Sequence, residues 1–439
     1  MTTKDEIILL TRKYHKEKEK EPFRRGKTYI PVAKAYFDER EIVSLVSAAL
    51  DMRWVDGAIT KQFEQDVAKY LGVRYAIMVN SGSSANLLAV AALTSSLLQS
   101  KALKPGDEII TVAAGFPTTV NPIIQNGLIP VFVDVNVGTY NTTPFLIEEA
   151  ITDKTRGIFI AHTLGNPYEV DEIQELAHRH NLWFIEDVAD GLGAEYGGKK
   201  VGTFGNLATT SFYPAHLIST GEGGMVFTDS PLLAKIVRSF RDWGRDCWCL
   251  PGKDNTCGKR FSQSDCGTLP DGFDHKYIYS HIGYNLKSTD LQASIGIEQL
   301  RKLPEFIEDR KENWEYLRNG FKEFGLDKYF VLPIQLKDSS PAWFGFLLTI
   351  KESAGFSRSE LVQFLEKKMI GTRNLFAGNL ARHPAYLEKP WRISDTVSGI
   401  PHTDIIMDRT FWIGCHPGMT RRMLDYMIEM FVEFKSLYE

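Results

Sequence analysis

Short apolar runs alternate with helix-like stretches between about residues 70 and 230, and this alternation constrains the fold more than any other feature. The runs are short, rich in β-branched or aromatic residues and bounded by turn residues, which is typical of strands. They cover residues 75–80, 108–113, 130–135, 157–162, 182–187, 208–213 and 224–228. The segment 169–181 carries apolar residues at helical spacing. Such βαβ units predict an α/β fold with a mostly parallel seven-stranded sheet.

The C-terminal third predicts a second, smaller α+β domain. Amphipathic helices are expected at 288–303 and 304–324, followed by a strand at 342–350 and helices at 357–369 and 421–438. We therefore expect a large domain at 51–300 and a small domain at 301–439, with residues 1–50 packing against the small one. The stretch 240–285, rich in Gly, Asp, Cys and aromatics, is an insertion in the large domain, and loops of that length are usually functional or disordered.

Composition narrows the class of protein. A net charge of -4 over 439 residues argues against a nucleic-acid or membrane-surface partner, because both favour a strongly positive protein. No apolar run approaches the roughly eighteen residues of a membrane span, and the start, MTTKDEIILL, lacks the pattern of a signal peptide. Five cysteines, an odd number, predict a reducing compartment, so we expect a cytoplasmic protein.

Three polar sites follow strands and point to one anionic ligand. Ser81-Gly82-Ser83-Ser84 joins a strand to a helix N-terminus, where free N–H groups favour a phosphate. Asp187 ends a strand, at the edge where α/β proteins bind ligands. Ser211 and His216 lie on a turn expected at the same edge. Each feature alone has a structural alternative: a common turn, a helix-capping carboxylate or a structural histidine.

Longer motifs carry a resemblance to a known family. They are NSGSSANLLA (80–89), VAAGFPTTVNPIIQNG (112–127), AHTLGNP (161–167), VGTFG (201–205), SFYPAH (211–216), GEGG (221–224) and FRDWGRDCWC (240–249). In these motifs, and from about residue 28 onward, the chain resembles the DegT/DnrJ/EryC1/StrS sugar aminotransferase and dehydratase family, which implies the pyridoxal-phosphate-dependent transferase architecture of fold type I. Within this family, the chain is most similar to the CDP-4-keto-6-deoxyglucose 3-dehydrase branch of dideoxyhexose biosynthesis.

The resemblance implies a role for each matching residue. Gly82, Ser83 and Ser211 would bind the cofactor phosphate. Phe116 would stack on the pyridine ring, and Asp187 would pair with its nitrogen. Asn285 would reach the phosphate of the partner subunit, because the family works as homodimers with shared active sites.

His216 stands where family aminotransferases carry the lysine that holds the cofactor covalently. No lysine lies between Lys200 and Lys235. The resemblance therefore implies a dehydratase that holds pyridoxamine phosphate non-covalently and uses His216 as a base. The implied substrate is a nucleotide-linked, by resemblance CDP-linked, 4-keto-6-deoxyhexose that loses its C3 hydroxyl group in the biosynthesis of deoxysugars for lipopolysaccharide.

Cysteines in the 240–285 insertion raise the question of an iron–sulfur cluster. Cys247, Cys249 and Cys257 are thiolates spaced closely enough for a soft metal. The 3-dehydrase branch carries a [2Fe–2S] cluster, fed by a flavin or iron–sulfur reductase, with four cysteine ligands. Three positions match here, but the first falls on Ala189. Cys266 is a candidate for the fourth ligand and Asp190 a weaker one, while Cys415 is expected to be structural.

Three alternatives remain open at this stage. The enzyme could lack the cluster and recharge its cofactor from glutamate, as GDP-4-keto-6-deoxymannose 3-dehydratases do. It could be a nucleotide-sugar aminotransferase, which the missing lysine disfavours. It could be a non-catalytic homologue, which the complete cofactor set disfavours.

Overall fold

The structure is a computed structural model of the chain and describes residues 1–18, 22–247, 249, 253–262, 267–394 and 399–438. The α-helices are α1 Thr3–Glu17, α2 Glu39–Leu50, α3 Ala58–Leu71, α4 Gly82–Ala92, α5 Pro117–Gln125, α6 Pro144–Glu149, α7 Val170–Arg179, α8 Pro231–Arg241, α9 Asp290–Glu323, α10 Arg358–Lys367, α11 Pro401–Arg409 and α12 Arg421–Lys435. The strands are β1 Tyr75–Val79, β2 Glu108–Val112, β3 Ile129–Val133, β4 Thr155–Ala161, β5 Trp183–Asp187, β6 Glu195–Tyr196, β7 Lys199–Lys200, β8 Leu207–Ser211, β9 Gly224–Thr228, β10 Phe330–Val331, β11 Ser339–Ser340, β12 Phe346–Ile350, β13 Arg373–Asn374, β14 Arg392–Ile393 and β15 Thr410–Ile413.

The central sheet confirms the expected α/β fold. Its strand order is β1-β9-β8-β5-β4-β2-β3-β14, and the seven runs expected from the sequence all form strands in it. The sheet is mostly parallel, with β9 running against both of its neighbours. The eighth strand, β14, is a two-residue segment from the C-terminal part that pairs with the edge strand β3.

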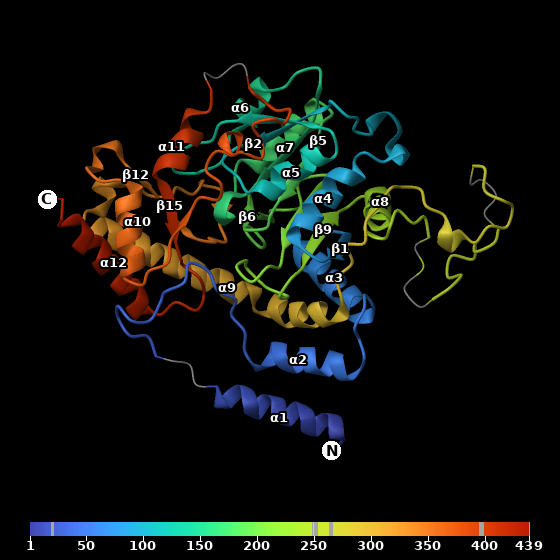
Figure 1. Cartoon of the computed structure of the whole chain (residues 1–439), viewed down its shortest axis with the longest axis horizontal. Coiled ribbons are helices and arrows are strands. Elements are labelled where there is room, and N and C mark those ends of the chain that lie inside the picture. Colours follow the sequence, from blue (N-terminus) through green and yellow to red (C-terminus); the bar gives the residue numbers. More distant parts are fainter. Residues whose placement is uncertain (19–21, 248, 250–252, 263–266, 395–398, 439) are drawn as a thin grey trace.

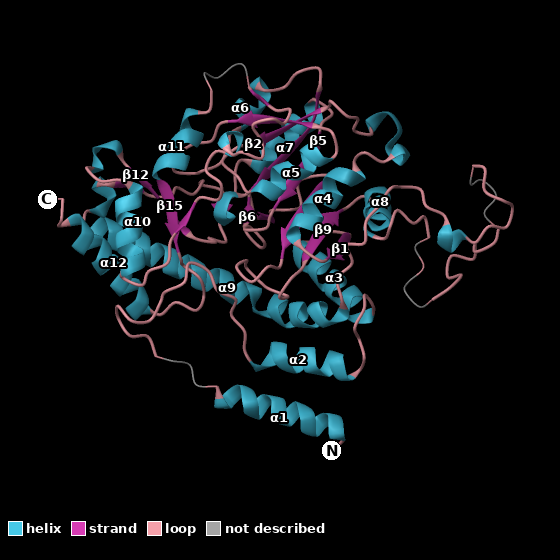
Figure 2. Ribbon diagram, in the orientation of Figure 1, coloured by secondary structure: helices cyan, strands magenta, loops and turns pink. Residues whose placement is uncertain are grey.

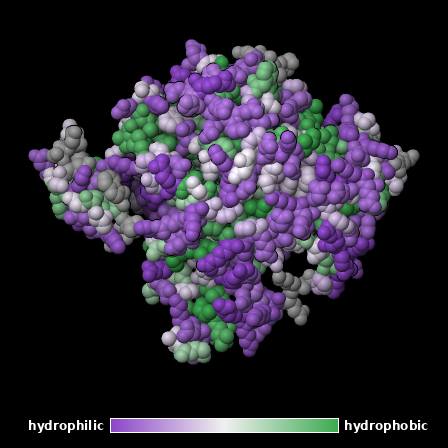
Figure 3. Space-filling view, turned by 180° about the vertical axis from the view of Figure 1, so that it is seen from behind, coloured by the Kyte–Doolittle hydropathy of each residue, from purple (hydrophilic) through white to green (hydrophobic). Residues whose placement is uncertain are grey.

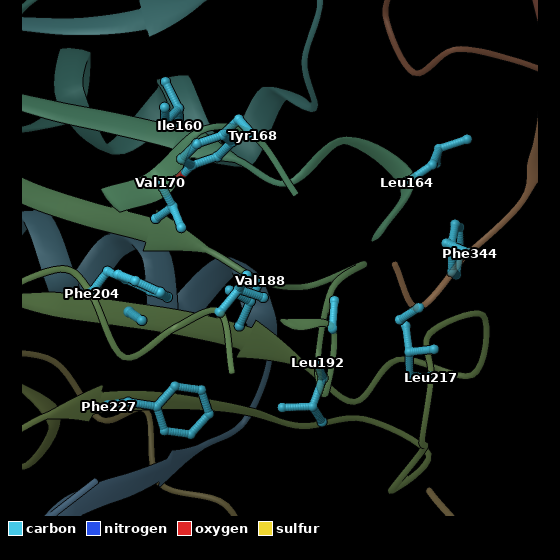
Figure 4. Close-up of a cluster of buried hydrophobic side chains, with 14 of the residues drawn as sticks. Ile160, Leu164, Tyr168, Val170, Val188, Leu192, Phe204, Leu217, Phe227 and Phe344 are labelled. Atoms are coloured by element: carbon cyan, nitrogen blue, oxygen red, sulfur yellow. The ribbon is translucent and has the colours of Figure 1, made fainter. Parts of the chain in front are cut away.

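Both faces of this sheet are buried, as expected for parallel strands (Figure 2). Ile158 and Ile160 of β4 pack on the side covered by α3, α7 and α9, while Phe159 packs on the side of α4 and α8. Figure 4 shows part of the first cluster, including Val188 and Leu192 in the turns after β5. These packed faces hold the strand ends, and the turns that follow them, in fixed positions.

A second sheet, β10-β12-β15-β13, packs with α10, α12 and the C-terminal half of α9 around its own core. The two helices expected at 288–303 and 304–324 are one continuous helix, α9. Pro304 does not end it, because apolar residues on both sides of the proline, Leu303 and Phe306 among them, are buried against the rest of the protein. α9 therefore spans the boundary expected between the two domains (Figure 1).

The chain termini and the 240–285 insertion lie at the periphery. α1 packs on α2, and α2 packs on α9. Backbone bridges Asp242–Asn285 and Arg245–Tyr279 close the base of the insertion. The other described residues of the insertion project beyond α8 in Figure 1 and lie in the lobe at the left of Figure 3. No helix of the described residues is long and apolar enough to cross a membrane.

Candidate active site

A cavity of about 1080 Å³ opens at the carboxyl ends of β4, β5 and β8. It is the place where open α/β sheets bind ligands, because strand ends and helix N-termini meet there. Most of the residues expected to hold the cofactor line it together: Gly82, Ser83, Phe116, Asp187, Ser211 and His216. Asn285 does not line the cavity of its own chain.

The N-terminus of α4 forms one end of the cavity. Ser81 caps this helix, and its Oγ accepts a hydrogen bond from the Ser84 N–H at 3.1 Å. A Cβ on Gly82 would lie 2.4 Å from the Ser211 Cβ, so only glycine lets the Ser211 hydroxyl lie against the helix start. N–H groups of a first helical turn have no partner within the helix and attract anions. This end of the cavity fits a phosphate.

Asp187 lies deep in the cavity and is almost fully buried. Its Oδ2 accepts hydrogen bonds from Asn86 Nδ2 at 2.9 Å and Thr119 Oγ1 at 2.8 Å, and its Oδ1 accepts one from the Ala189 N–H at 3.0 Å. Burial raises the pKa of this carboxyl group, although these hydrogen bonds favour its ionised form. Among the described residues, no positively charged side chain forms an ion pair with Asp187. A protonated pyridine nitrogen would supply the missing positive charge.

His216 lies on the turn after β8, and its side chain is 18% exposed. Its backbone N–H donates to the Tyr213 carbonyl at 2.9 Å, which fixes the turn. The imidazole lies 5.4 Å from the Phe344 ring, centroid to centroid, and lines the cavity together with Asp187. An imidazole and a buried carboxylate thus line one cavity.

Phe116 stands at the start of α5 on the cavity wall, half exposed, with its ring 5.8 Å from that of Phe376. An aromatic face in this position can cover a planar ring. The position of the Phe116 ring is compatible with stacking on a pyridine ring.

Sequence reasoning missed the residues that come from distant segments. Tyr29 and Lys34 approach from the N-terminal segment, and Arg373 and Trp412 from the second sheet. No local motif marks them, because only the packing of the second sheet brings them to the cavity. Asn86, which holds Asp187, was within reach of sequence analysis: it follows the phosphate turn by one helical turn and faces the same way.

The cysteines occupy a different place from Ala189. Cys247, Cys249 and Cys257 line a small hollow in the insertion with His275, whereas Ala189 lines the main cavity. Cys257 Sγ lies 3.7 Å from His275 Nδ1, and Asp190 lies beside His216 rather than beside the cysteines. Among the described residues no group of three or more His, Cys, Asp or Glu is arranged to hold a metal ion. Cys266 lies outside the described residues.

The cysteine thiols differ in pKa and in burial. A hydrogen bond from Thr256 lowers the pKa of Cys249 to about 7, while burial raises that of Cys247. Cys415 is fully buried, its Sγ donates to the Trp343 carbonyl at 3.2 Å, and burial raises its pKa to about 12. The described residues therefore do not supply the four thiolates that the family resemblance requires for a [2Fe–2S] cluster.

Comparison with known proteins identifies the family of this chain. The family model of the DegT/DnrJ/EryC1/StrS aminotransferase family matches residues 37–432. The chain belongs to this family. It is 53% identical to a dTDP-4-dehydro-2,6-dideoxy-D-glucose 3-dehydratase of Saccharopolyspora spinosa, over 98% of this chain and 92% of the relative. It is 52% identical to the lipopolysaccharide biosynthesis protein RfbH of Salmonella typhimurium, over 95% of this chain and 94% of the relative.

A solved structure supports the assignment to this family. A GDP-4-keto-6-deoxymannose-3-dehydratase with a trapped PLP–glutamate geminal diamine superposes with a TM-score of 0.80 at 33% identity, over 92% of this chain and 100% of the other. Membership of this family and the mostly parallel sheet together confirm the expected fold type I architecture.

Proposed function

We propose that this chain is a pyridoxamine-phosphate-dependent nucleotide-sugar 3-dehydratase, which removes the C3 hydroxyl group of a nucleotide-linked 4-keto-6-deoxyhexose. The observation that carries the proposal is that His216, which the resemblance puts at the position of the family lysine, lines the same cavity as the buried Asp187. Without an amine at this position the side chain cannot hold the cofactor covalently, but it can still accept a proton. The relatives named as 3-dehydratases, at 53% and 33% identity, support it.

Each residue has a task in this reaction. The α4 N-terminus and Ser211 bind the phosphate of the cofactor, and Asp187 keeps its ring nitrogen protonated. The bound cofactor supplies an amine for the C4 ketone and a ring that accepts electrons. His216 takes a proton from C4′, the carbon of the cofactor that bears its amino group.

The mouth of the cavity fits a negatively charged substrate. Lys34 and Arg373 are exposed cations on its lining, on two segments that lie far apart in the sequence. Two cations at an opening attract a diphosphate group. We propose CDP as the nucleotide, on the family resemblance. Measuring kcat/KM for the CDP-, dTDP- and GDP-linked 4-keto-6-deoxyhexoses tests this choice, and the CDP-linked sugar should give the highest value.

The proposed assembly is a cytoplasmic homodimer. Asn285 lies beside the base of the insertion and outside the cavity of its own chain, which is compatible with a contact to the partner subunit's phosphate site. Light scattering of the purified enzyme tests the dimer. In mixtures of Asn285→Ala and His216→Asn subunits, shared sites would restore part of the activity in the heterodimer.

Ala189 favours a second candidate for cofactor recharging. Because the ligand set for a cluster is incomplete in the described residues, we propose that glutamate transfers its amino group to the cofactor and leaves as 2-oxoglutarate, in place of a route that a reductase feeds with electrons. Adding glutamate to the enzyme with pyridoxal phosphate would convert the aldehyde absorption band to that of the amine. A requirement for a reductase, with no response to glutamate, would favour the cluster-dependent route.

The decisive test is product formation. Purified enzyme with pyridoxamine phosphate should release the C3 oxygen of an ¹⁸O-labelled substrate into water, detected by mass spectrometry. Transfer of an amino group to the sugar, with the C3 oxygen retained, would instead identify an aminotransferase.

A further inference from the structure

A second carboxylate of the cavity lining, that of Asp190, lies beside His216. Asp190 follows β5 by three residues, in the turn that also holds Asp187, and its side chain is 10% exposed. Its Oδ1 lies 3.2 Å from His216 Nδ1. The contact is a close approach of the two groups and not a hydrogen bond, because Nδ1 has no hydrogen-bond partner. Catalytic hydrogen bonds are often poorly aligned before substrate binds.

Only one nitrogen of the imidazole faces this carboxylate. A neutral imidazole carries one proton, and the partner of one nitrogen decides which nitrogen holds it. An ionised carboxylate only accepts hydrogen bonds, so Asp190 selects the tautomer with the proton on Nδ1. Nε2 is then left unprotonated and able to act as a base.

Arg310 places a positive charge near Asp190. This arginine of α9 is fully buried and donates from Nη1 to the Phe344 carbonyl at 3.0 Å. It lines a small hollow behind His216, and the nearby charge of Asp190 counteracts the lowering of the Arg310 pKa by burial.

We infer that Asp190 is a positioning residue for His216: it holds the proton on Nδ1 and stabilises the imidazolium that forms when Nε2 takes a proton. In that step the proton of the C4′–H bond moves to Nε2, the electron pair of the bond passes to the cofactor, and the Nδ1–H remains between the ring and Asp190. Asp190 touches neither cofactor nor substrate in this role. The inference rests on the proposed function, because it assigns His216 as the base.

The test uses Asp190→Asn, which keeps the shape and removes the charge. The C4′ hydrogen-exchange rate should fall at least about 100-fold, as expected when a base loses its orienting carboxylate. Cofactor affinity and substrate KM should stay unchanged. Asp134→Asn is the matched control: Asp134 is equally buried and accepts from the Thr403 N–H at 2.8 Å, but lies outside the cavity. Wild-type exchange in Asp190→Asn would overturn the inference.

A second measurement needs no stable variant. ¹⁵N NMR of histidine-labelled wild-type enzyme, with the His216 signal assigned by its absence in His216→Asn, reports which ring nitrogen carries the proton. The inference requires Nδ1–H, and an Nε2–H signal would overturn it. Failure of the proposed function is distinguishable, because the wild type itself would then show no C4′ exchange, whatever the tautomer.

Discussion

Glu186 and Asp187 are neighbours in sequence, yet their carboxylates face opposite sides of the sheet. Glu186 accepts hydrogen bonds from the N–H groups of Gly202, Phe204 and Gly205 at 2.7 to 2.8 Å. Asp187 accepts its hydrogen bonds on the cavity side. Successive side chains of a strand point to opposite faces, so one carboxylate fastens β5 to the loop before β8 while the next is presented to the ligand.

Replacing Asp187 by asparagine should separate stability from function. Because burial raises the pKa of Asp187, the protonated carboxyl stabilises the cofactor-free fold at low pH, and this contribution is lost as pH rises through the folded pKa. Asp187→Asn should therefore be more stable than the cofactor-free wild type at neutral pH, and the difference should shrink toward low pH. Urea unfolding across pH measures this difference. The affinity of Asp187→Asn for pyridoxamine phosphate should be lower than that of the wild type. Equal affinity would contradict the assignment of Asp187 as the partner of the ring nitrogen.

Gly224→Ala should disrupt the phosphate end of the cavity. A Cβ at Gly224 would lie 2.4 Å from the Ser81 carbonyl oxygen and 2.6 Å from the Gly82 nitrogen, both backbone atoms. We expect a loss of about 1–3 kcal/mol in the free energy of unfolding and weaker cofactor binding. Gly418→Ala is the control, since its nearest contact would be 3.4 Å. Cofactor binding at wild-type strength in Gly224→Ala would show that the turn tolerates a shift.

The strands could be predicted from the sequence because they are short and strongly apolar, and all seven formed. The helix α9 could not be placed correctly, because Pro304 is a local stop signal that tertiary packing overrides. Asp187 and His216 lie on marked motifs, so their meeting in one cavity could be anticipated. The presence of Tyr29 and Arg373 in the cavity could not be predicted, because their positions depend on how the second sheet packs and no local sequence pattern encodes that packing.

Arg241→Met should destabilise the fold far more than a change at its neighbour Arg238. Arg241 is buried at the end of α8, donates to the Met78 carbonyl at 2.9 Å and pairs with Asp56 at 3.2 Å. Removing it leaves buried carboxylates uncompensated, which costs about 3–5 kcal/mol in the free energy of unfolding. Arg238→Met, with 37% of the side chain exposed, should change it little in urea titrations. Similar effects of both changes would contradict this account of Arg241.

Ala189→Cys tests the cluster question. After anaerobic reconstitution with iron and sulfide, we expect the wild type to hold iron below one cluster per chain, because Ala189 provides no thiolate. The added cysteine should leave the iron and sulfide content as low as in Ala189→Ser, because Ala189 lines the main cavity and the three cysteines line a separate hollow. A full complement of iron in the wild type would show that another residue completes the ligand set.

The role of His216 as the base is the centre of the account, and C4′ hydrogen exchange in His216→Asn tests it most directly. The variant keeps a polar side chain of similar length and should bind pyridoxamine phosphate as the wild type does. Its rate of C4′ exchange with solvent should fall by about 10²–10⁴-fold, the usual contribution of a positioned base. Exchange at the wild-type rate, with the cofactor bound, would show that another group removes the proton.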